Sequence, residues 1–69
     1  MKISARNQLK GKIISIQEGA VNAIVQIDIG GGNLITSSIS LEAVKELKLE
    51  VGREAYAIIK ASSVMIGAQ

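Results

Sequence analysis

The residues from Val21 to Ile29 alternate between apolar and more polar side chains, and this alternation constrains the fold more than any other feature of the sequence. One face of an extended chain would carry Val21, Ala23, Val25, Ile27 and Ile29. The other face would carry Asn22, Ile24, Gln26 and Asp28. Successive side chains of a strand point to opposite faces, so the pattern predicts a β-strand with one buried face.

Four further segments have strand character. They run from Leu9 to Gln17, Leu34 to Ile39, Ala55 to Lys60 and Val64 to Ile66. An adjacent apolar pair, Ile13-Ile14, interrupts the alternation of the first, which indicates a bulge or a strand that is apolar on both faces. The segment Gly30-Gly31-Gly32-Asn33 predicts a hairpin turn, because glycine readily adopts positive φ.

One short helix is expected from Leu41 to Leu47, where apolar residues recur at helical spacing. Ser40 precedes it as a suitable N-cap. The order of elements is then three strands, a helix and two strands. This order predicts a single all-β domain over residues 1–69, a five-stranded OB-like Greek-key barrel with one short helix between strands three and four.

The apolar content is high for so short a chain. Hydrophobic residues make up 48% of the 69 residues, and there is no Cys and no His. A chain of this length buries only about 60% of its unfolded surface, and disulfides or an ordinary zinc site cannot support it here. The surplus apolar surface therefore predicts a homo-oligomer.

Targeting signals are not evident in the sequence. No apolar run approaches the ~18 residues that cross a bilayer, and the first residues are not followed by the apolar stretch of a signal peptide. We therefore expect a cytoplasmic protein with no membrane partner.

Catalysis is not expected. Without His or Cys the chain has no imidazole base and no Ser-His or Cys-His pair. Four carboxylates follow a four-residue spacing, at Glu42, Glu46, Glu50 and Glu54. Lysines and an arginine lie among them, so a solvated helix face is the preferred interpretation, and no metal-ligand set is predicted.

Two kinds of binding function remain, binding of a small anion and binding of a macromolecule. The alternative to anion binding is a small module that binds nucleic acid or protein and has no oxyanion ligand, since OB-like barrels often bind single strands. Such binding depends on aromatic side chains that stack on bases, and Tyr56 is the only aromatic residue. The net charge of +2 is also small for a protein that follows phosphates. No nucleic acid is therefore expected as a partner.

A tetrahedral anion suits the remaining polar residues. A dianion held without a metal needs N–H groups, hydroxyls and cations in one place. Three clusters supply them, Ser4-Ala5-Arg6-Asn7, Thr36-Ser37-Ser38-Ile39-Ser40 and Lys60-Ala61-Ser62-Ser63. Each cluster also has a structural interpretation, because serines are common in turns and Ser40 is a helix cap.

The same residues resemble the molbindin (Mop) family of molybdate-binding proteins and the related domains of molybdate-responsive regulators and transporter ATPases. The similarity is carried by five segments in family order, Ile3 to Gly11, Gly19 to Ala23, Ile35 to Ser40, Val51 to Ala57 and Ile59 to Met65. Together these segments cover nearly the whole chain.

The resemblance implies a hexamer, a trimer of dimers, that stores molybdate or tungstate at subunit interfaces and uses no organic cofactor. It implies a first class of site formed by Ser4, Ala5, Arg6 and Asn7 with Lys60, Ala61 and Ser62, joined by Ala20, Val21 and Asn22 of a neighbouring subunit. It implies a second class near threefold axes, drawn from Ser37, Ser38 and Ser40. A regulatory domain that senses molybdate is a further possibility.

The chemistry of these anions agrees with such a site. Molybdate is a fully deprotonated dianion at neutral pH, so it requires only hydrogen-bond donors. Phosphate near pH 7 still carries a proton and needs an acceptor, which a site without carboxylates does not provide. Sulfate has the charge of molybdate and is smaller, so only the size of the cavity can exclude it.

Overall fold

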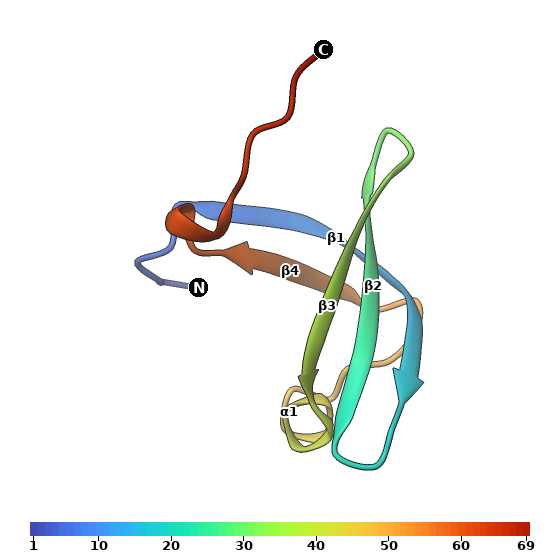
Figure 1. Cartoon of the computed structure of the whole chain (residues 1–69). Coiled ribbons are helices and arrows are strands. Elements are labelled where there is room, and N and C mark those ends of the chain that lie inside the picture. The colour runs from blue at the N-terminus through green and yellow to red at the C-terminus, as the bar shows by residue number, and fades with distance from the viewer.

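The computed structural model describes residues 1–69 and contains four strands, one short α-helix and one 3-10 turn (Figure 1). In chain order these elements are β1 (Asn7–Glu18), β2 (Asn22–Gly30), β3 (Asn33–Ser40), α1 (Leu41–Glu46), β4 (Glu54–Ile59) and η1 (Ala61–Ser63). The four strands and the helix lie where the sequence predicts them, with ends that differ by at most two residues.

The strands form one antiparallel sheet in the order β3-β2-β1-β4. β1 is long enough to serve two neighbours, with its first half paired to β4 and its second half to β2. Lys12 belongs to both ladders, opposite Glu54 on β4 and opposite Asp28 on β2. The register shifts between Ile13 and Ser15, which confirms the bulge predicted from Ile13-Ile14, and the sheet curls into two arms (Figure 1).

Gly11 lies at the crossing of these arms. A Cβ atom built there would collide with the carbonyl oxygen of Asp28 and lie 2.6 Å from Cγ2 of Ile27. The neighbouring strand can come this close only because glycine has no side chain.

Helix α1 follows β3 without a loop. The hydroxyl of Ser40 accepts a hydrogen bond from the amide of Ala43 at 3.1 Å, which confirms Ser40 as the N-cap. The helix is held to the sheet by Val44, its one buried residue. It ends at the C-cap Leu47, and Lys48 then takes a positive φ of 54° that turns the chain toward β4.

The predicted fifth strand is not formed. Val64 to Ile66 leave the sheet as an extended tail, with Met65 and Ile66 exposed by 92% and 89% (Figure 1). A β-strand exists only where a neighbouring strand accepts its hydrogen bonds, and the tail has no such neighbour within its own chain. The observed sheet therefore has four strands, and the OB-like barrel is open.

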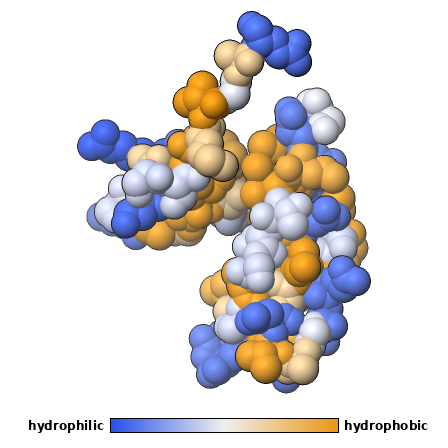
Figure 2. Space-filling view, in the orientation of Figure 1, coloured by the Kyte–Doolittle hydropathy of each residue, from blue (hydrophilic) through white to orange (hydrophobic).

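The surface is apolar on both sides of the gap between the two arms (Figure 2).

None of the helices has the length and apolar character to span a membrane.

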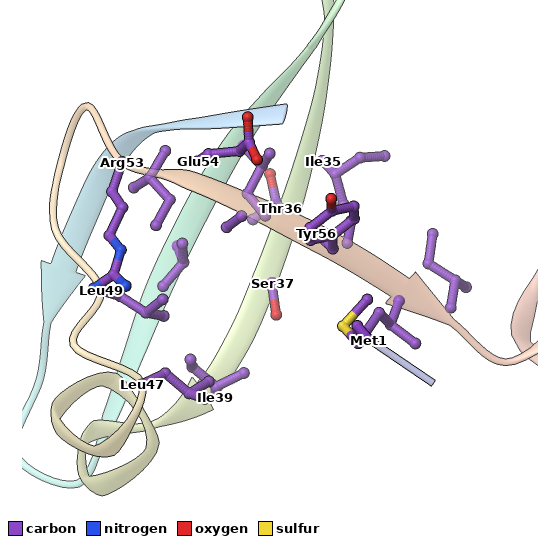
Figure 3. Close-up of a pocket in the computed structure, with 17 residues that line it drawn as sticks. Met1, Ile35, Thr36, Ser37, Ile39, Leu47, Leu49, Arg53, Glu54 and Tyr56 are labelled. Carbon is purple, nitrogen blue, oxygen red and sulfur yellow. The ribbon is translucent and has the colours of Figure 1, made fainter. Parts of the chain in front are cut away.

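A groove of about 620 Å³ runs through this gap, between β3 and β4 (Figure 3). Thirteen of its seventeen lining residues are hydrophobic. The open barrel thus exposes a continuous apolar channel along its unpaired side.

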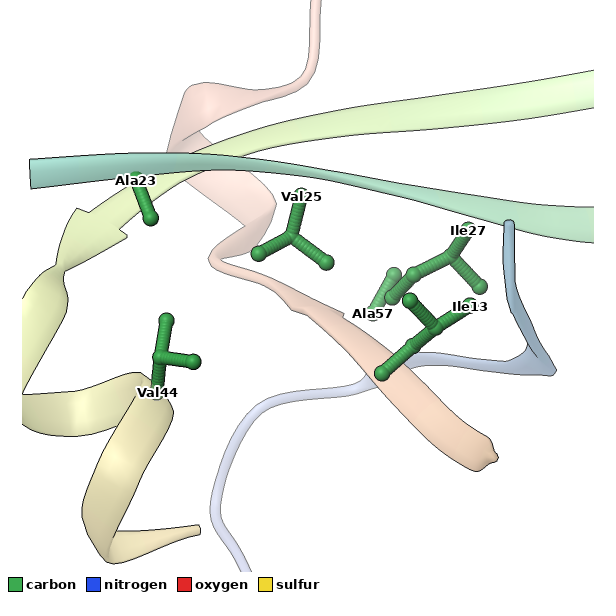
Figure 4. Packing of buried hydrophobic residues seen from close by; sticks show 6 residues of the cluster. All are labelled: Ile13, Ala23, Val25, Ile27, Val44 and Ala57. Carbon is green, nitrogen blue, oxygen red and sulfur yellow. The ribbon is translucent and has the colours of Figure 1, made fainter. Parts of the chain in front are cut away.

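The buried core is small, with six residues that pack together (Figure 4). They are Ile13, Ala23, Val25, Ile27, Val44 and Ala57. Ala23, Val25 and Ile27 come from the alternating segment of β2, which confirms a buried face over these residues. Val21, expected on the same face, lies before β2 and is 72% exposed. Six core residues in a chain with 48% hydrophobic residues leave much apolar surface outside the core.

Candidate oxyanion-binding site

Two of the three predicted donor clusters meet at one end of the sheet. β1 begins at Asn7 and β4 ends at Ile59, and these two residues are the last pair of their ladder. The segment Ser4–Arg6 therefore leads into the sheet beside the point where Lys60–Ser62 leads out. Fifty-two positions separate Asn7 and Ile59 in sequence, so the β1–β4 ladder is what brings the clusters together.

Side chains reinforce this junction. The Nδ2 atom of Asn7 donates a hydrogen bond to the carbonyl oxygen of Ile59 at 3.1 Å, and this contact is partly buried. The Nε2 atom of Gln8 donates to the carbonyl oxygen of Ala5 at 2.7 Å, which fixes the approach of the N-terminal segment. The role of Gln8 was not predicted, although the residue lies inside the family-like segment Ile3 to Gly11.

The second segment forms the turn η1. The amide of Ser63 donates to the carbonyl of Lys60 at 2.8 Å, and the amide of Val64 donates to the carbonyl of Ala61 at 3.2 Å. The first amides of such a turn, those of Ala61 and Ser62, have no acceptor within it. The turn thus holds backbone donors in the segment that also carries the side chains of Lys60 and Ser62.

The charged groups of the junction have no acidic partner. The single ion pair of the chain joins Lys10 to Glu54 at 3.4 Å, and both of its side chains are exposed. Arg6 and Lys60 are exposed and take part in no ion pair. The two segments that meet here carry a guanidinium, an ammonium and hydroxyls and no carboxylate, which are groups that can donate to an anion.

The segment Ala20–Asn22 lies elsewhere in the same chain. Ala20 and Val21 lie in the turn between β1 and β2, and Asn22 is the first residue of β2, at the opposite end of β1 from Asn7; all three are exposed. One subunit alone therefore does not bring Ala20, Val21 and Asn22 to the junction of Ser4–Arg6 with Lys60–Ser62.

The hydroxyl-rich segment of β3 is divided between the two faces of the sheet. Ser37 is opposite the buried Val25 and lines the apolar groove, whereas Ser38 is opposite the exposed Ile24. Ser40 is on the same face as Ser38 but already accepts the cap hydrogen bond from α1. A single pocket within one subunit therefore does not collect all three serines.

A shallow hollow on the outer face brings together residues that the sequence assigned to different sites. Asn22 and Ser38 both line it, with Gln17, Glu18, Gly19 and Ile24. Gln17 was not among the predicted residues. The carboxylate of Glu18 makes this hollow less suitable for a dianion than the junction at Asn7 and Ile59.

Metal-binding residues are not clustered anywhere in the structure. No group of three or more Cys, His, Asp or Glu residues is placed to hold a metal ion.

Comparison with known proteins matches residues 3–66 to the TOBE domain family. The chain is 74% identical, over the full length of both proteins, to a probable molybdenum-pterin-binding protein of Haemophilus influenzae. Its structure superposes on MopII from Clostridium pasteurianum with a TM-score of 0.91 and 52% identity, covering 97% of this chain and 100% of MopII. It also superposes on the cytoplasmic molybdate-binding protein ModG in its molybdate-bound form, with a TM-score of 0.93 and 48% identity, covering 100% of this chain and 49% of ModG. These similarities confirm the resemblance seen in the sequence, and the chain belongs to the molbindin family of TOBE-domain proteins.

Proposed function

We propose that this protein binds molybdate or tungstate at subunit interfaces of a homo-oligomer and serves as a cytoplasmic store of the anion. The observation that carries the proposal is the junction of Ser4–Arg6 with Lys60–Ser62, held by the hydrogen bond from Asn7 to Ile59. It gathers cationic groups, hydroxyls and amides and contains no carboxylate.

The need for an oligomer is supported by the exposure of this junction. Ser4, Arg6 and Lys60 are all open to solvent in the single chain. Hydrogen bonds and charges bind an anion more strongly where water is excluded, so a neighbouring subunit would improve the site by covering it. The exposed segment Ala20–Asn22 of a neighbour is our candidate for that cover, and a hexamer our candidate assembly.

The inorganic anion is preferred over an organic cofactor, although relatives are called molybdenum-pterin-binding proteins. A pterin ring presents donors as well as acceptors along its edge and has flat faces that favour aromatic contacts. The junction has cationic donors and no carboxylate, and Tyr56, the one aromatic residue, lies on β4 before the junction begins. This chemistry matches a fully deprotonated tetrahedral oxyanion.

The second class of site is also retained as a proposal. Ser38 and Ser40 lie on the outer face of β3, so a symmetric arrangement of subunits could bring several copies of them together. Ser37 lies on the other face and would require a separate environment. No observation here favours a regulatory function over storage.

Native mass spectrometry with molybdate, tungstate and sulfate would test the proposal. We expect an oligomer that gains a fixed number of molybdate or tungstate ions and few or no sulfate ions. An oligomer that gains none would refute oxyanion storage. Salt-sensitive binding to single-stranded DNA with no response to molybdate would favour the nucleic-acid alternative instead.

A further inference from the structure

The N-terminal segment of the candidate site is tied to the sheet by one hydrogen bond. Residues 1–6 belong to no strand or helix, and their main-chain groups make no backbone hydrogen bond. The one hydrogen bond that reaches them runs from Nε2 of Gln8 to the carbonyl oxygen of Ala5, at 2.7 Å. The hydrogen bonding that orders Ser4–Arg6 therefore comes from a single side chain.

This bond fixes the direction of a peptide plane. The carbonyl of Ala5 and the amide N–H of Arg6 belong to the same planar peptide unit, and in a trans unit they point in opposite directions. With the carbonyl held toward Gln8, the N–H of Arg6 is turned to the other side of the segment. That N–H has no acceptor within the chain, so it is free to donate to a ligand.

The neighbouring carboxamides of Asn7 and Gln8 each hold one half of the junction. Asn7 donates to the carbonyl of Ile59, directly before Lys60, whereas Gln8 donates to the carbonyl of Ala5. The C-terminal half is also held by the β1–β4 ladder, which ends at the pair of Asn7 and Ile59. No ladder reaches Ala5, so the N-terminal half depends more on its side-chain bond than the C-terminal half does.

We propose that Gln8 is a positioning residue for the oxyanion. It orients the peptide between Ala5 and Arg6 in advance, so the amide and the guanidinium of Arg6 start from a fixed main-chain position when the anion arrives. A segment that is ordered before binding loses less conformational freedom on binding, which raises the affinity. Gln8 acts through this peptide and need not touch the anion. The inference rests on the proposed function, because it assigns a role within the same site.

The substitution Gln8→Met tests this role. Methionine has nearly the length of glutamine but cannot donate a hydrogen bond from its side chain. Gln26→Met is the matched control, because Nε2 of Gln26 also makes one exposed hydrogen bond, to Oγ1 of Thr36 at 3.3 Å. This second bond joins β2 to β3, away from the junction, so both variants lose one carboxamide bond and only Gln8→Met affects the site.

The first measurement uses NMR relaxation of the amide nitrogens of Ser4, Ala5 and Arg6 in the anion-free protein. We expect their order parameters to fall below about 0.6 in Gln8→Met and to stay at the parental values in Gln26→Met. The free energy of unfolding should change no more in Gln8→Met than in the control, since the lost bond lies outside the ladders. Parental order in Gln8→Met would overturn the positioning role.

The second measurement is calorimetric titration with molybdate. Gln8→Met should bind about 5- to 10-fold more weakly than the parent, and Gln26→Met should bind as the parent does. Weaker binding of Gln8→Met with parental order would make Gln8 a direct ligand, and lost order with parental affinity would make its bond irrelevant to the anion. Either result overturns the proposal. A parent protein that binds no molybdate refutes the proposed function itself, and this failure is distinct because it appears without any substitution.

Discussion

The side-chain amide of Asn7 donates a hydrogen bond to the main-chain carbonyl of Ile59, 3.1 Å away, at the end of the β1–β4 ladder. This bond joins the two segments that we propose as the anion site. Because of this bond, the side-chain NH2 group of Asn7 already donates to a carbonyl of the protein. In the proposed site, the side chain of Asn7 would therefore act by placing the two segments and need not contact the anion.

Replacing Asn7 with Ala should weaken molybdate binding and loosen η1 even before the anion is added. The loss of one such hydrogen bond costs about 1 kcal/mol, and the segment Lys60–Ser62 would be held to β1 by the main-chain ladder alone. Amide hydrogen exchange of Ser63 and Val64 in the anion-free protein should become faster. If binding is lost while this exchange is unchanged, Asn7 is a direct ligand and the positioning role is wrong.

Arg6→Ala and Lys60→Ala should each weaken molybdate binding by about 10- to 100-fold, because each removes a charged donor. Both side chains are exposed and free of ion pairs, so the fold should remain unchanged by circular dichroism. Lys12→Ala is the matched control, because Lys12 is an exposed cation on β1 away from the junction. Isothermal titration calorimetry would measure the affinities, and parental affinity in both site variants would place the site elsewhere.

Ser40 can be tested for its two assigned roles with two substitutions. Ser40→Ala removes the cap on α1 and should lower the free energy of unfolding by about 1 kcal/mol. Ser40→Asp retains a cap oxygen but adds a negative charge that repels an oxyanion. A ligand role predicts that Ser40→Asp reduces the number of bound molybdate ions while stability is kept. Unchanged stoichiometry would leave Ser40 as a cap alone.

Gly11→Ala should destabilise the protein strongly, because the new methyl group would collide with the backbone of Asp28. Overpacking of this kind costs about 1–3 kcal/mol, and a rigid backbone neighbour places the change at the upper end. Gly67→Ala is the control, since a Cβ there meets nothing within 4 Å. Chemical denaturation of both variants at one protein concentration would measure the difference. Equal stabilities would mean that β1 and β2 are farther apart than described.

The strands and the helix could be predicted from the sequence because their signals are local. Alternation in Val21 to Ile29 and the cap at Ser40 depend on neighbours a few positions away. The fate of Val64 to Ile66 could not be predicted, because these residues have strand character but find no partner strand in their own chain. A pattern in the sequence specifies what a segment can pair with, and another strand must be available for the pairing to occur.

The candidate site was predicted only in part for the same reason. The clusters at Ser4 and Lys60 were visible as residue types, but the bond from Asn7 to Ile59 depends on the register of two strands far apart in sequence. The separation of Ser37 from Ser38 could have been predicted, because adjacent residues of a strand always face opposite sides. Treating the serines as one group overlooked this rule.

The double pairing of Lys12, opposite both Asp28 and Glu54, determines where the chain can change in length. Removing one residue from β1 would turn every following side chain to the other face and separate the bulge from β2. The loss would damage both arms, because a single strand serves both ladders. Variation in length should therefore be better tolerated in the turn at residues 31–32 and in the loop at residues 47–53, which belong to no ladder.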